Sequence, residues 1–522
     1  MALDSREVID EQILKAEADI QQLKARRNTY TPAAMLPIDI LSYIFQFPAD
    51  LEGHTREELL VKYMVPITQV CHRWRTIAIE TATLWTRVPL GYLQWTEELL
   101  RRSKGAGIDV ENRLIAGGQS IAGHPSEREA LDCVFVNIGA VRRLSLRSIE
   151  QWEAQILFQA FNRSSGTLKI EDLTLTLTSN DVSGPTIGSS VLAALAGCGQ
   201  MVPSTVQILV TLNNVTTLEV LHLSFSVLGC PSLREGDNGL SSADSQHHGR
   251  VEFPLLHDLL LTMPISRNAF VCTALPMSAI LRPLSLHPPR KLNLECAVTH
   301  ATSLSTLLHS VNDACGWMKG SSLQSLYLRF DAEYGEVFVA GSFSSPKMTK
   351  FVRDGDFSLH LLYQDFSDEE IFQQLFSGLP LHDLGYLAFL GCPMDIPASA
   401  WASTFGRLQR LQIVIMQDAE LQKFLPALVE KNPFNDGLCF PGLRKFEAIH
   451  VNFRKDDNTS FAMLKDMLMR RREDARINEI RLTVCRFHPE QAEQLRKFRN
   501  VKLRKEVYHG SDSSDWEDFD FM

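Results

Sequence analysis

The N-terminal segment carries apolar residues at alternating steps of four and three, with charged and polar residues at most of the positions between them. This spacing predicts an amphipathic helix over residues 1–30 with a heptad seam. The seam extends over only about two heptads, which leaves two alternatives open: self-association through this helix, or packing of the helix on its own protein. The seam residues are Ile9, Ile13, Ala16, Ile20 and Leu23.

Residues 31–90 have the pattern of a small helical module. Pro32 ends the preceding helix, because a proline has no backbone N–H to continue it. Pro37 and Asp39 suit the first turn of a new helix, since proline fits there and a carboxylate faces the positive end of the helix dipole. Apolar residues follow at helical spacing as far as Phe45, which predicts the first helix of this module.

Two further helices are predicted in the same module. Thr55 and Glu58 have the spacing of a capping box, which predicts a helix over residues 55–63. Pro66 ends that helix and begins a third one, over residues 66–80, whose apolar residues lie on one broad face. A helical unit this small has more apolar surface than it can bury alone, so we expect a partner or the following domain to cover part of it.

Beyond about residue 135, short runs follow the pattern L-x-x-L-x-L, separated by segments with helical spacing such as 151–161 and 460–472. Strand then helix, repeated, predicts an α/β solenoid of irregular leucine-rich repeats over residues 135–505, with a parallel sheet on its inner face. Because the spacing is uneven, an ordinary α/β domain with leucine-rich buried strands remains the alternative. The clearest runs start at Leu218, Leu256, Leu323, Leu384, Leu408, Leu443 and Ile477, with partial copies at Leu292/Leu294 and Leu359/Leu361.

The run that starts at Leu323 makes a specific prediction about the two faces of a strand. Side chains alternate along a strand, so Leu326 and Leu328 are expected in the core while Tyr327 and Arg329 face the opposite side. If helices covered both faces of the sheet, the second pair would be buried as well.

The remaining segments are predicted from composition. Residues 91–134 are expected to be a linker or the start of the array, residues 232–250 a mobile loop, and residues 506–522 an acidic disordered tail. In that tail, Ser514 has acidic residues at +1 and +3, which makes it a candidate phosphosite. The alternative is that the tail only aids solubility.

Composition and charge limit the class of function. The chain has 522 residues and a net charge of -10, so nucleic acid is not expected as a partner, because that role needs a basic face. The basic run of residues 470–472 suggests either nuclear import or a nucleic-acid contact, or only a favourable charge at a helix end. No secretory signal or membrane-spanning stretch occurs, which predicts a cytoplasmic or nuclear protein that does not enter the membrane.

Candidate chemistry is sparse in the sequence. The ten cysteines form no CxxC pair, and His247-His248 has no companion ligands, so neither a metal site nor a cofactor is predicted. No P-loop, GxGxxG after a strand, G-x-S-x-G or H-E-x-x-H motif occurs. The chain is therefore predicted not to be an enzyme, and no catalytic residue is assigned.

The helical module resembles a known family. It contains Leu36-Pro37-x-Asp39-Ile40-Leu41-x-x-Ile44-Phe45, then Val70-Cys71-x-x-Trp74-Arg75-x-Ile77-Ala78, then Leu84-Trp85. This string resembles the F-box-like domain, and is similar in particular to the fungal variety that follows a short heptad helix and precedes leucine-rich repeats. Two departures occur: the loop 46–59 is longer than in the compact F-box, which affects the second helix most, and Ala82 stands where the family often has proline.

The resemblance implies a three-helix module that docks on the Skp-type adaptor of an SCF ubiquitin ligase, and hence on its cullin, while the rest of the chain holds a protein substrate. It therefore implies a substrate-recognition subunit. The alternative is a leucine-rich-repeat scaffold without a ubiquitin role. Carried over by position, the residues that contact the adaptor or brace the contact are Leu36, Pro37, Leu41, Ile44, Val70, Cys71 and Trp74.

Overall fold

The computed structural model divides the chain into two compact units, Met1–Thr178 with Asn214–Leu218 (unit 1) and Ser179–Asn213 with Glu219–Met522 (unit 2). The predicted loop 232–250, the tail 506–522 with Ser514, and most of the loop 46–59 lie outside the described residues. The structure describes residues 2–47, 60–112, 125–149, 156–157, 159–161, 163–164, 168–177, 215, 217–225, 251–263, 273–282, 284–286, 291–316, 322–331, 334–344, 356–364, 367–391, 396–418, 421–431, 437–454, 459–471 and 476–504.

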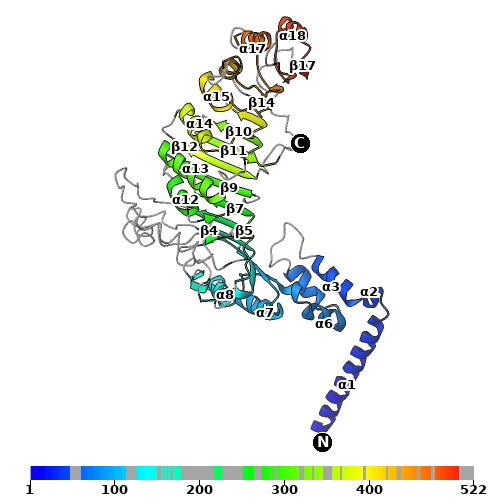
Figure 1. Cartoon of the computed structure of the whole chain (residues 1–522). Helices are drawn as coiled ribbons and strands as arrows, with labels where there is room; N and C mark the ends of the chain where they lie inside the picture. The colour runs from blue at the N-terminus through cyan, green and yellow to red at the C-terminus, as the bar shows by residue number, and fades with distance from the viewer. Residues whose placement is uncertain are drawn as a thin grey trace. The chain divides into compact units, whose positions relative to one another are not determined.

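Unit 1 starts with helices. The heptad segment forms one long helix, α1 (Ala2–Asn28), and α2 (Pro32–Met35) and α3 (Ile38–Gln46) follow (Figure 1). Next come a π-helical turn η2 (Leu60–Met64), α5 (Val65–Ile67), α6 (His72–Glu80) and a 3-10 turn η3 (Ala82–Trp85). No described helix is both long enough and apolar enough to cross a membrane.

The third helix of the module differs from its prediction. One helix was expected over residues 66–80, but the chain leaves the helical conformation after α5 and resumes it at α6. Thr68 Oγ1 donates to the Val65 carbonyl at 2.6 Å, which closes the short helix. Cys71 is extended, and its Sγ accepts from the Trp74 N–H at 3.5 Å, so this cysteine caps α6 rather than lying inside a helix.

The remainder of unit 1 is a small parallel sheet with helices. Its strands pair in the order β1 (Arg87–Val88), β2 (Ile108–Glu111), β3 (Val141–Ile149) and β4 (Asp172–Leu177). The helices between them are α7 (Leu93–Arg102) and α8 (Pro125–Val136), with a 3-10 turn η5 (Ile138–Ala140). The sheet therefore begins at β1, before residues 91–134, and β2 lies within that range, where Ile108 and Val110 are fully buried strand residues.

Unit 2 is built on a larger, mostly parallel sheet. Its strand order is β5 (Val220–Phe225), β7 (Asp258–Thr262), β9 (Lys291–Val298), β12 (Phe357–Tyr363), β11 (Glu336–Ser342), β10 (Ser325–Asp331), β13 (Tyr386–Gly391), β14 (Ile413–Gln417), β15 (Lys445–Ile449), β16 (Glu479–Thr483) and β17 (Val501–Arg504). A separate pair joins β6 (Val251–Glu252) to β8 (Leu284–Ser285).

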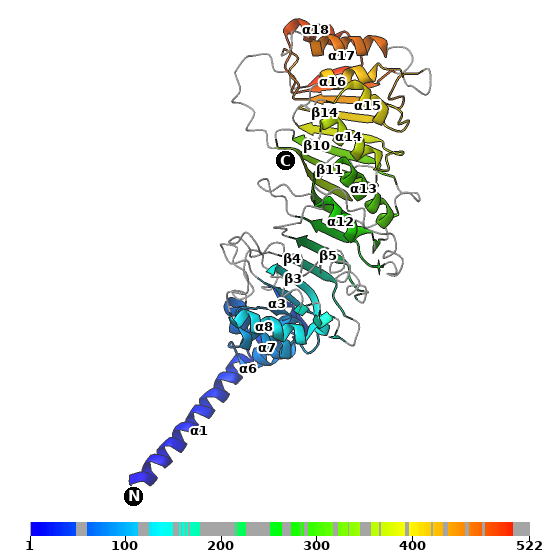
Figure 2. The same cartoon turned by 90° about the vertical axis from the view of Figure 1, so that its left-hand side faces the viewer.

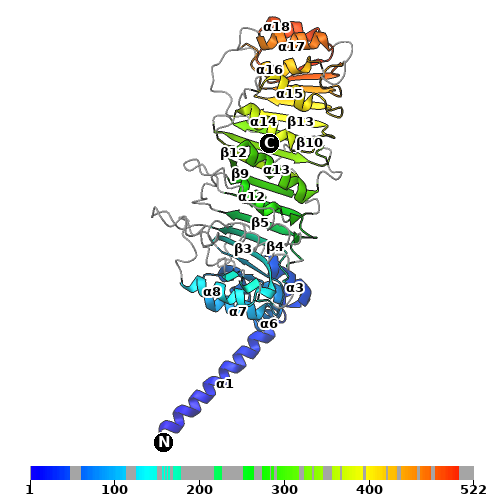
Figure 3. The ribbon, with the colours of Figure 1, turned by 60° about the vertical axis from the view of Figure 1, so that its left-hand side comes forward.

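Helices lie along one face of this sheet, as Figures 1, 2 and 3 show. Leu326 and Leu328 point to this face and are 1% and 0% exposed, whereas Tyr327 is half-buried and Arg329 is exposed. The predicted alternation is confirmed, and unit 2 is an open sheet. The helices are α12 (Ala274–Leu281), α13 (Ala301–Cys315), α14 (Asp368–Ser377), α15 (Ala398–Phe405), α16 (Leu421–Phe424), the 3-10 turn η8 (Leu425–Leu428), α17 (Thr459–Arg470) and α18 (Pro489–Arg496).

The simple alternation of strand and helix is broken in the middle of the sheet. β10, β11 and β12 form an antiparallel meander, so that β12 rather than β10 pairs with β9. Gly335 permits the reversal before β11: its φ is +64°, and a Cβ there would lie 2.5 Å from the Tyr363 carbonyl oxygen. The two partial leucine runs prove to be neighbours, since Leu292 is opposite Phe357 and Leu294 is opposite Leu359.

Candidate functional site

The helix α3 has one buried face and one exposed apolar face. Leu41 and Phe45, one turn apart, are 0% and 1% exposed and form the inner face. Pro37 precedes the helix in an extended conformation, and its carbonyl accepts from the Leu41 N–H at 3.0 Å. The outer residues, called here the α3 surface, are Pro37, Ile40 (44% exposed), Tyr43 (71%), Ile44 (44%) and Phe47 (69%).

Hydrogen bonds hold both ends of α3 in the module. Before the helix, the Arg73 guanidinium donates to the Leu36 carbonyl at 2.6 Å. At its C-terminal end, Gln46 Nε2 donates to Thr83 Oγ1 at 2.7 Å. These two hydrogen bonds therefore fix both ends of the helix that carries the α3 surface.

Aromatic packing holds the inner face of α3. The Phe45 ring lies 5.1 Å from the Trp74 ring, with the two planes inclined by 56°. Trp85 is fully buried, and its Nε1 donates to the Ala78 carbonyl at 2.7 Å. The Arg102 guanidinium lies 4.5 Å from the centre of the Trp85 ring. Both tryptophans therefore stabilise the module.

The predicted adaptor-contact residues fall into three groups by exposure. Pro37, Ile44 and Val70 are exposed, so a partner can reach them. Leu41 is fully buried; it can brace the contact but cannot itself touch a partner. The others are half-buried: Leu36, Cys71 and Trp74.

Sequence reasoning missed several exposed residues of this surface. Ile40, Tyr43 and Phe47 were not assigned, although Ile40 and Phe47 follow Pro37 and Ile44 by three residues and belong to the same helix face. Helical spacing counted from Pro37 would have found them. Met35, 75% exposed, adds a further apolar side chain just before α3.

The chemistry of the α3 surface is that of a docking surface. Its members carry no charge, and the only polar group among them is the Tyr43 hydroxyl. Burying one large apolar side chain contributes about 1.5–3 kcal/mol. A cluster containing Tyr43 and Phe47 has the aromatic character of binding hot spots. Such a surface can hold a protein partner and offers no group for acid, base or nucleophilic chemistry.

The open face of the unit 2 sheet carries a second, mixed surface. Ala388, Ile415 and Ile449 are packed together on it, and the half-buried Tyr327 and Tyr386 lie against them. Burial raises the pKa of Tyr386 to about 12, so this phenol stays protonated at neutral pH. The patch is apolar with hydroxyl groups at its margin.

Charged groups lie beside this patch on the same sheet. His360 Nδ1 is 3.4 Å from a Glu295 oxygen, and its Nε2 is 3.7 Å from a Glu336 oxygen. The hydrogen bond with Glu295 is the main cause that raises the pKa of His360. Lys445 Nζ lies 2.8 Å from a Glu447 oxygen, and both residues belong to β15, the strand that also carries Ile449. The open face thus combines aromatic, apolar and paired charged side chains, a composition suited to recognising a protein surface.

The basic run 470–472 is not a continuous surface cluster. Arg470 bonds Asp466 one turn before it on α17, with 2.9 Å between Nε and the carboxylate oxygen. Arg471 is 2% exposed and donates to the carbonyls of Leu428, Cys439 and Phe440. The hypothesis of an exposed import or nucleic-acid motif is therefore wrong for Arg471, because its guanidinium is enclosed by backbone oxygens.

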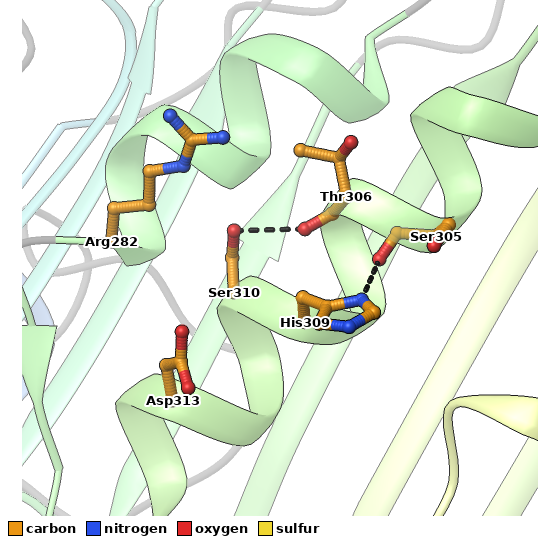
Figure 4. A pocket seen from close by; sticks show the side chains of 6 residues that line it. All are labelled: Arg282, Ser305, Thr306, His309, Ser310 and Asp313. Atoms are coloured by element: carbon orange, nitrogen blue, oxygen red, sulfur yellow. Dashed lines mark hydrogen bonds between the residues drawn. The ribbon is translucent and has the colours of Figure 1, made fainter. Parts of the chain in front are cut away.

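Other candidate sites carry little chemistry. Figure 4 shows a hollow lined by residues of α13 and by Arg282; its dashed lines run from His309 and Ser310 to backbone oxygens one turn earlier. Ser367 and Glu370 form a capping box at the start of α14, and Asp368 and Glu369 lie in the first turn of that helix. Within the residues that the structure describes, no group of three or more His, Cys, Asp or Glu side chains could hold a metal ion.

Comparison with known proteins identifies the segment that contains α3. The family model described as F-box-like matches residues 33–90, which run from within α2 to two residues beyond β1. The predicted F-box-like domain is confirmed over that range. No curated protein matches the chain.

Proposed function

With an F-box-like domain at residues 33–90 as the premise, we propose that the chain is the substrate-recognition subunit of an SCF-type ubiquitin ligase. The domain binds a Skp-type adaptor and through it the cullin, and the rest of the chain holds a protein substrate. The observation that carries this proposal is the α3 surface: exposed apolar side chains on a fixed helix inside the matched domain.

The apolar area that α3 exposes favours binding of a partner. A small module that leaves Tyr43, Ile44 and Phe47 between 44% and 71% exposed on one helix gains free energy when a partner covers them. The inner residues Leu41 and Phe45 keep the helix in place, so little ordering is needed on binding. A pre-ordered apolar surface of this kind is suited to stable binding of an adaptor.

Unit 2 is assigned the role of substrate recognition. Many of its strands follow the L-x-x-L-x-L runs, and β13 to β17 pair in parallel with helical segments between them. We take this array to be a solenoid of degenerate leucine-rich repeats, of the type found in fungal F-box-like proteins. Its open face holds the substrate, and the chain acts without catalysis of its own, in the cytoplasm or the nucleus.

The test is co-purification of the full chain with a Skp-type adaptor. The double variant Ile44→Asp/Phe47→Asp places two charges on the α3 surface and should weaken adaptor binding at least ~10-fold, because hot-spot side chains are each worth about 2 kcal/mol or more. Both residues are exposed, so thermal unfolding should change little. The matched control is Val136→Asp, at an 84% exposed apolar residue that ends α8 of the same unit.

The outcomes separate the candidate functions. Adaptor binding by the wild type and by Val136→Asp, with loss in the double variant, supports the ligase subunit. If the folded wild type retains no adaptor, the result favours the alternative function, a scaffold without a ubiquitin role. If the double variant still binds the adaptor, the α3 surface is not part of the adaptor contact.

A further inference from the structure

The long helix α1 exposes an apolar seam from Ile9 to Leu23. The seam, called here the α1 seam, consists of Ile9, Ile13, Ala16, Ile20 and Leu23, and its four large members are 50–65% exposed. Every side chain from Arg6 to Arg27 is exposed, so no described residue covers this helix. Figure 3 draws α1 as a single uninterrupted helix.

A helix in this state lacks the usual source of helical stability. Most helices in folded proteins are stabilised by packing of their apolar face, and isolated helices are marginal in water. Here the apolar residues return at steps of four and three, which keeps them on one stripe of the helix surface. The stripe is therefore expected to be covered in solution.

We propose that α1 pairs with α1 of a second copy of this chain in a parallel, two-stranded coiled coil. The pairing does not depend on adaptor binding. Because parallel helices have their C-terminal ends together, the dimer brings two copies of the α2–α3 segment to the same end of the coiled coil.

The seam residues favour two strands. Ile13 and Ile20 occupy one set of core positions, and Ile9, Ala16 and Leu23 occupy the other. β-Branched residues in the first set with leucine in the second favour parallel dimers, and this chain has that combination at Ile20 and Leu23. The seam ends at arginines on both sides, so it is short and the association should depend on concentration.

The flanking charges select the second copy and its direction. In a parallel pair, Asp19 of one helix lies beside Lys24 of the other, and the symmetric contact repeats on the opposite side. An antiparallel pair instead brings Asp19 against Asp19 and Glu17 against Glu17, or Asp10 against Glu17. The first of these antiparallel registers also brings Asp10 against Lys24, so its attractive contacts are offset by the two like-charge ones. At these flanking positions, only the parallel pair has attractive contacts without like-charge contacts.

The experiment measures the mass of the full chain by sedimentation equilibrium over a concentration series. The wild type should rise from 58.8 kDa towards twice that mass as concentration increases. The seam variant Ile13→Asp/Ile20→Asp should remain a single chain throughout. Its matched control, Val8→Asp/Leu14→Asp, makes the same changes at residues equally exposed on other faces of α1 and should dimerise.

The direction is tested by charge exchange. Asp19→Lys and Lys24→Asp should each raise the dimer dissociation constant, and the double variant should restore it to within about threefold of the wild type. A wild type that stays a single chain at every soluble concentration overturns the proposal. So does a dimer that survives the seam variant, or one that the control also abolishes. Failure of the double variant to recover overturns the parallel direction.

Discussion

Replacing Arg471 by methionine should destabilise the C-terminal part of unit 2. The guanidinium donates from Nε to the Leu428 carbonyl at 2.7 Å and from Nη2 to the carbonyls of Cys439 and Phe440. These oxygens belong to η8 and to the segment before β15, so one side chain joins separate parts of the backbone. Methionine keeps most of the apolar stem but donates no hydrogen bond.

The change in the free energy of unfolding is the difference between two opposing effects. The Leu428 and Cys439 carbonyls lose the donor that Arg471 supplies, whereas the Phe440 carbonyl keeps the Leu443 N–H at 3.2 Å. Each buried carbonyl that loses its donor costs about 1–3 kcal/mol, or about 4 kcal/mol for two at the middle of that range. The variant also avoids burying a charge: burial lowers the pKa of Arg471 from 12.5 to about 10, equivalent to roughly 3 kcal/mol. The net loss in the free energy of unfolding should therefore be about 1 kcal/mol.

The assay is urea unfolding of the full chain, followed by tryptophan fluorescence and by circular dichroism. The control is Arg470→Met at the preceding residue, which is 62% exposed and bonds only Asp466 on its own helix. It should cost less than about 0.5 kcal/mol. Equal midpoints for the two variants would show that the Leu428 and Cys439 carbonyls do not depend on Arg471, and the reasoning would be refuted.

Three further predictions follow from single side chains. Leu41→Ala should weaken adaptor binding only indirectly, by lowering module stability by about 2–5 kcal/mol, which thermal unfolding with and without adaptor separates. Leu326→Ala should cost a similar amount while Arg329→Ala costs under about 0.5 kcal/mol, as compared by urea midpoints. Glu295 raises the pKa of His360 in the folded state. The protonated His360 therefore stabilises the fold fully below about pH 6.5, and this contribution is lost as pH rises through the higher folded pKa. His360→Gln should flatten the dependence of the free energy of unfolding on pH across this range.

The sequence was informative wherever side-chain spacing alone decides burial. Leu326 and Leu328 could be assigned to the core because alternation in a strand leaves one face for the helices. The motif around Pro37 and Ile44 located the F-box-like domain, which the family match confirms. The sequence did not separate the buried residues of this domain from the exposed ones, since Leu41 and Ile44 look alike in sequence but lie on different faces of α3.

Features that depend on long-range contacts could not be predicted. Nothing near Arg471 in the sequence indicates that carbonyls 31 to 43 residues away enclose it. The basic run 470–472 therefore suggested an exposed cluster of positive charge. Cys71 looked like one more apolar helix residue, whereas its thiol caps α6. The meander of β10 to β12 was hidden because antiparallel and parallel strands share the same alternation of side chains.

The meander also affects the order in which unit 2 can fold during synthesis. β9 is made before β10 and β11, yet its ladder partner is β12, which leaves the ribosome after both of them. Until Phe357–Tyr363 emerges, the hydrogen-bonding edge of β9 has no partner from its own sheet on that side. The nascent chain cannot lengthen this sheet strand by strand. We expect β10, β11 and β12 to dock as one block, with a period of edge exposure that a chaperone would need to cover.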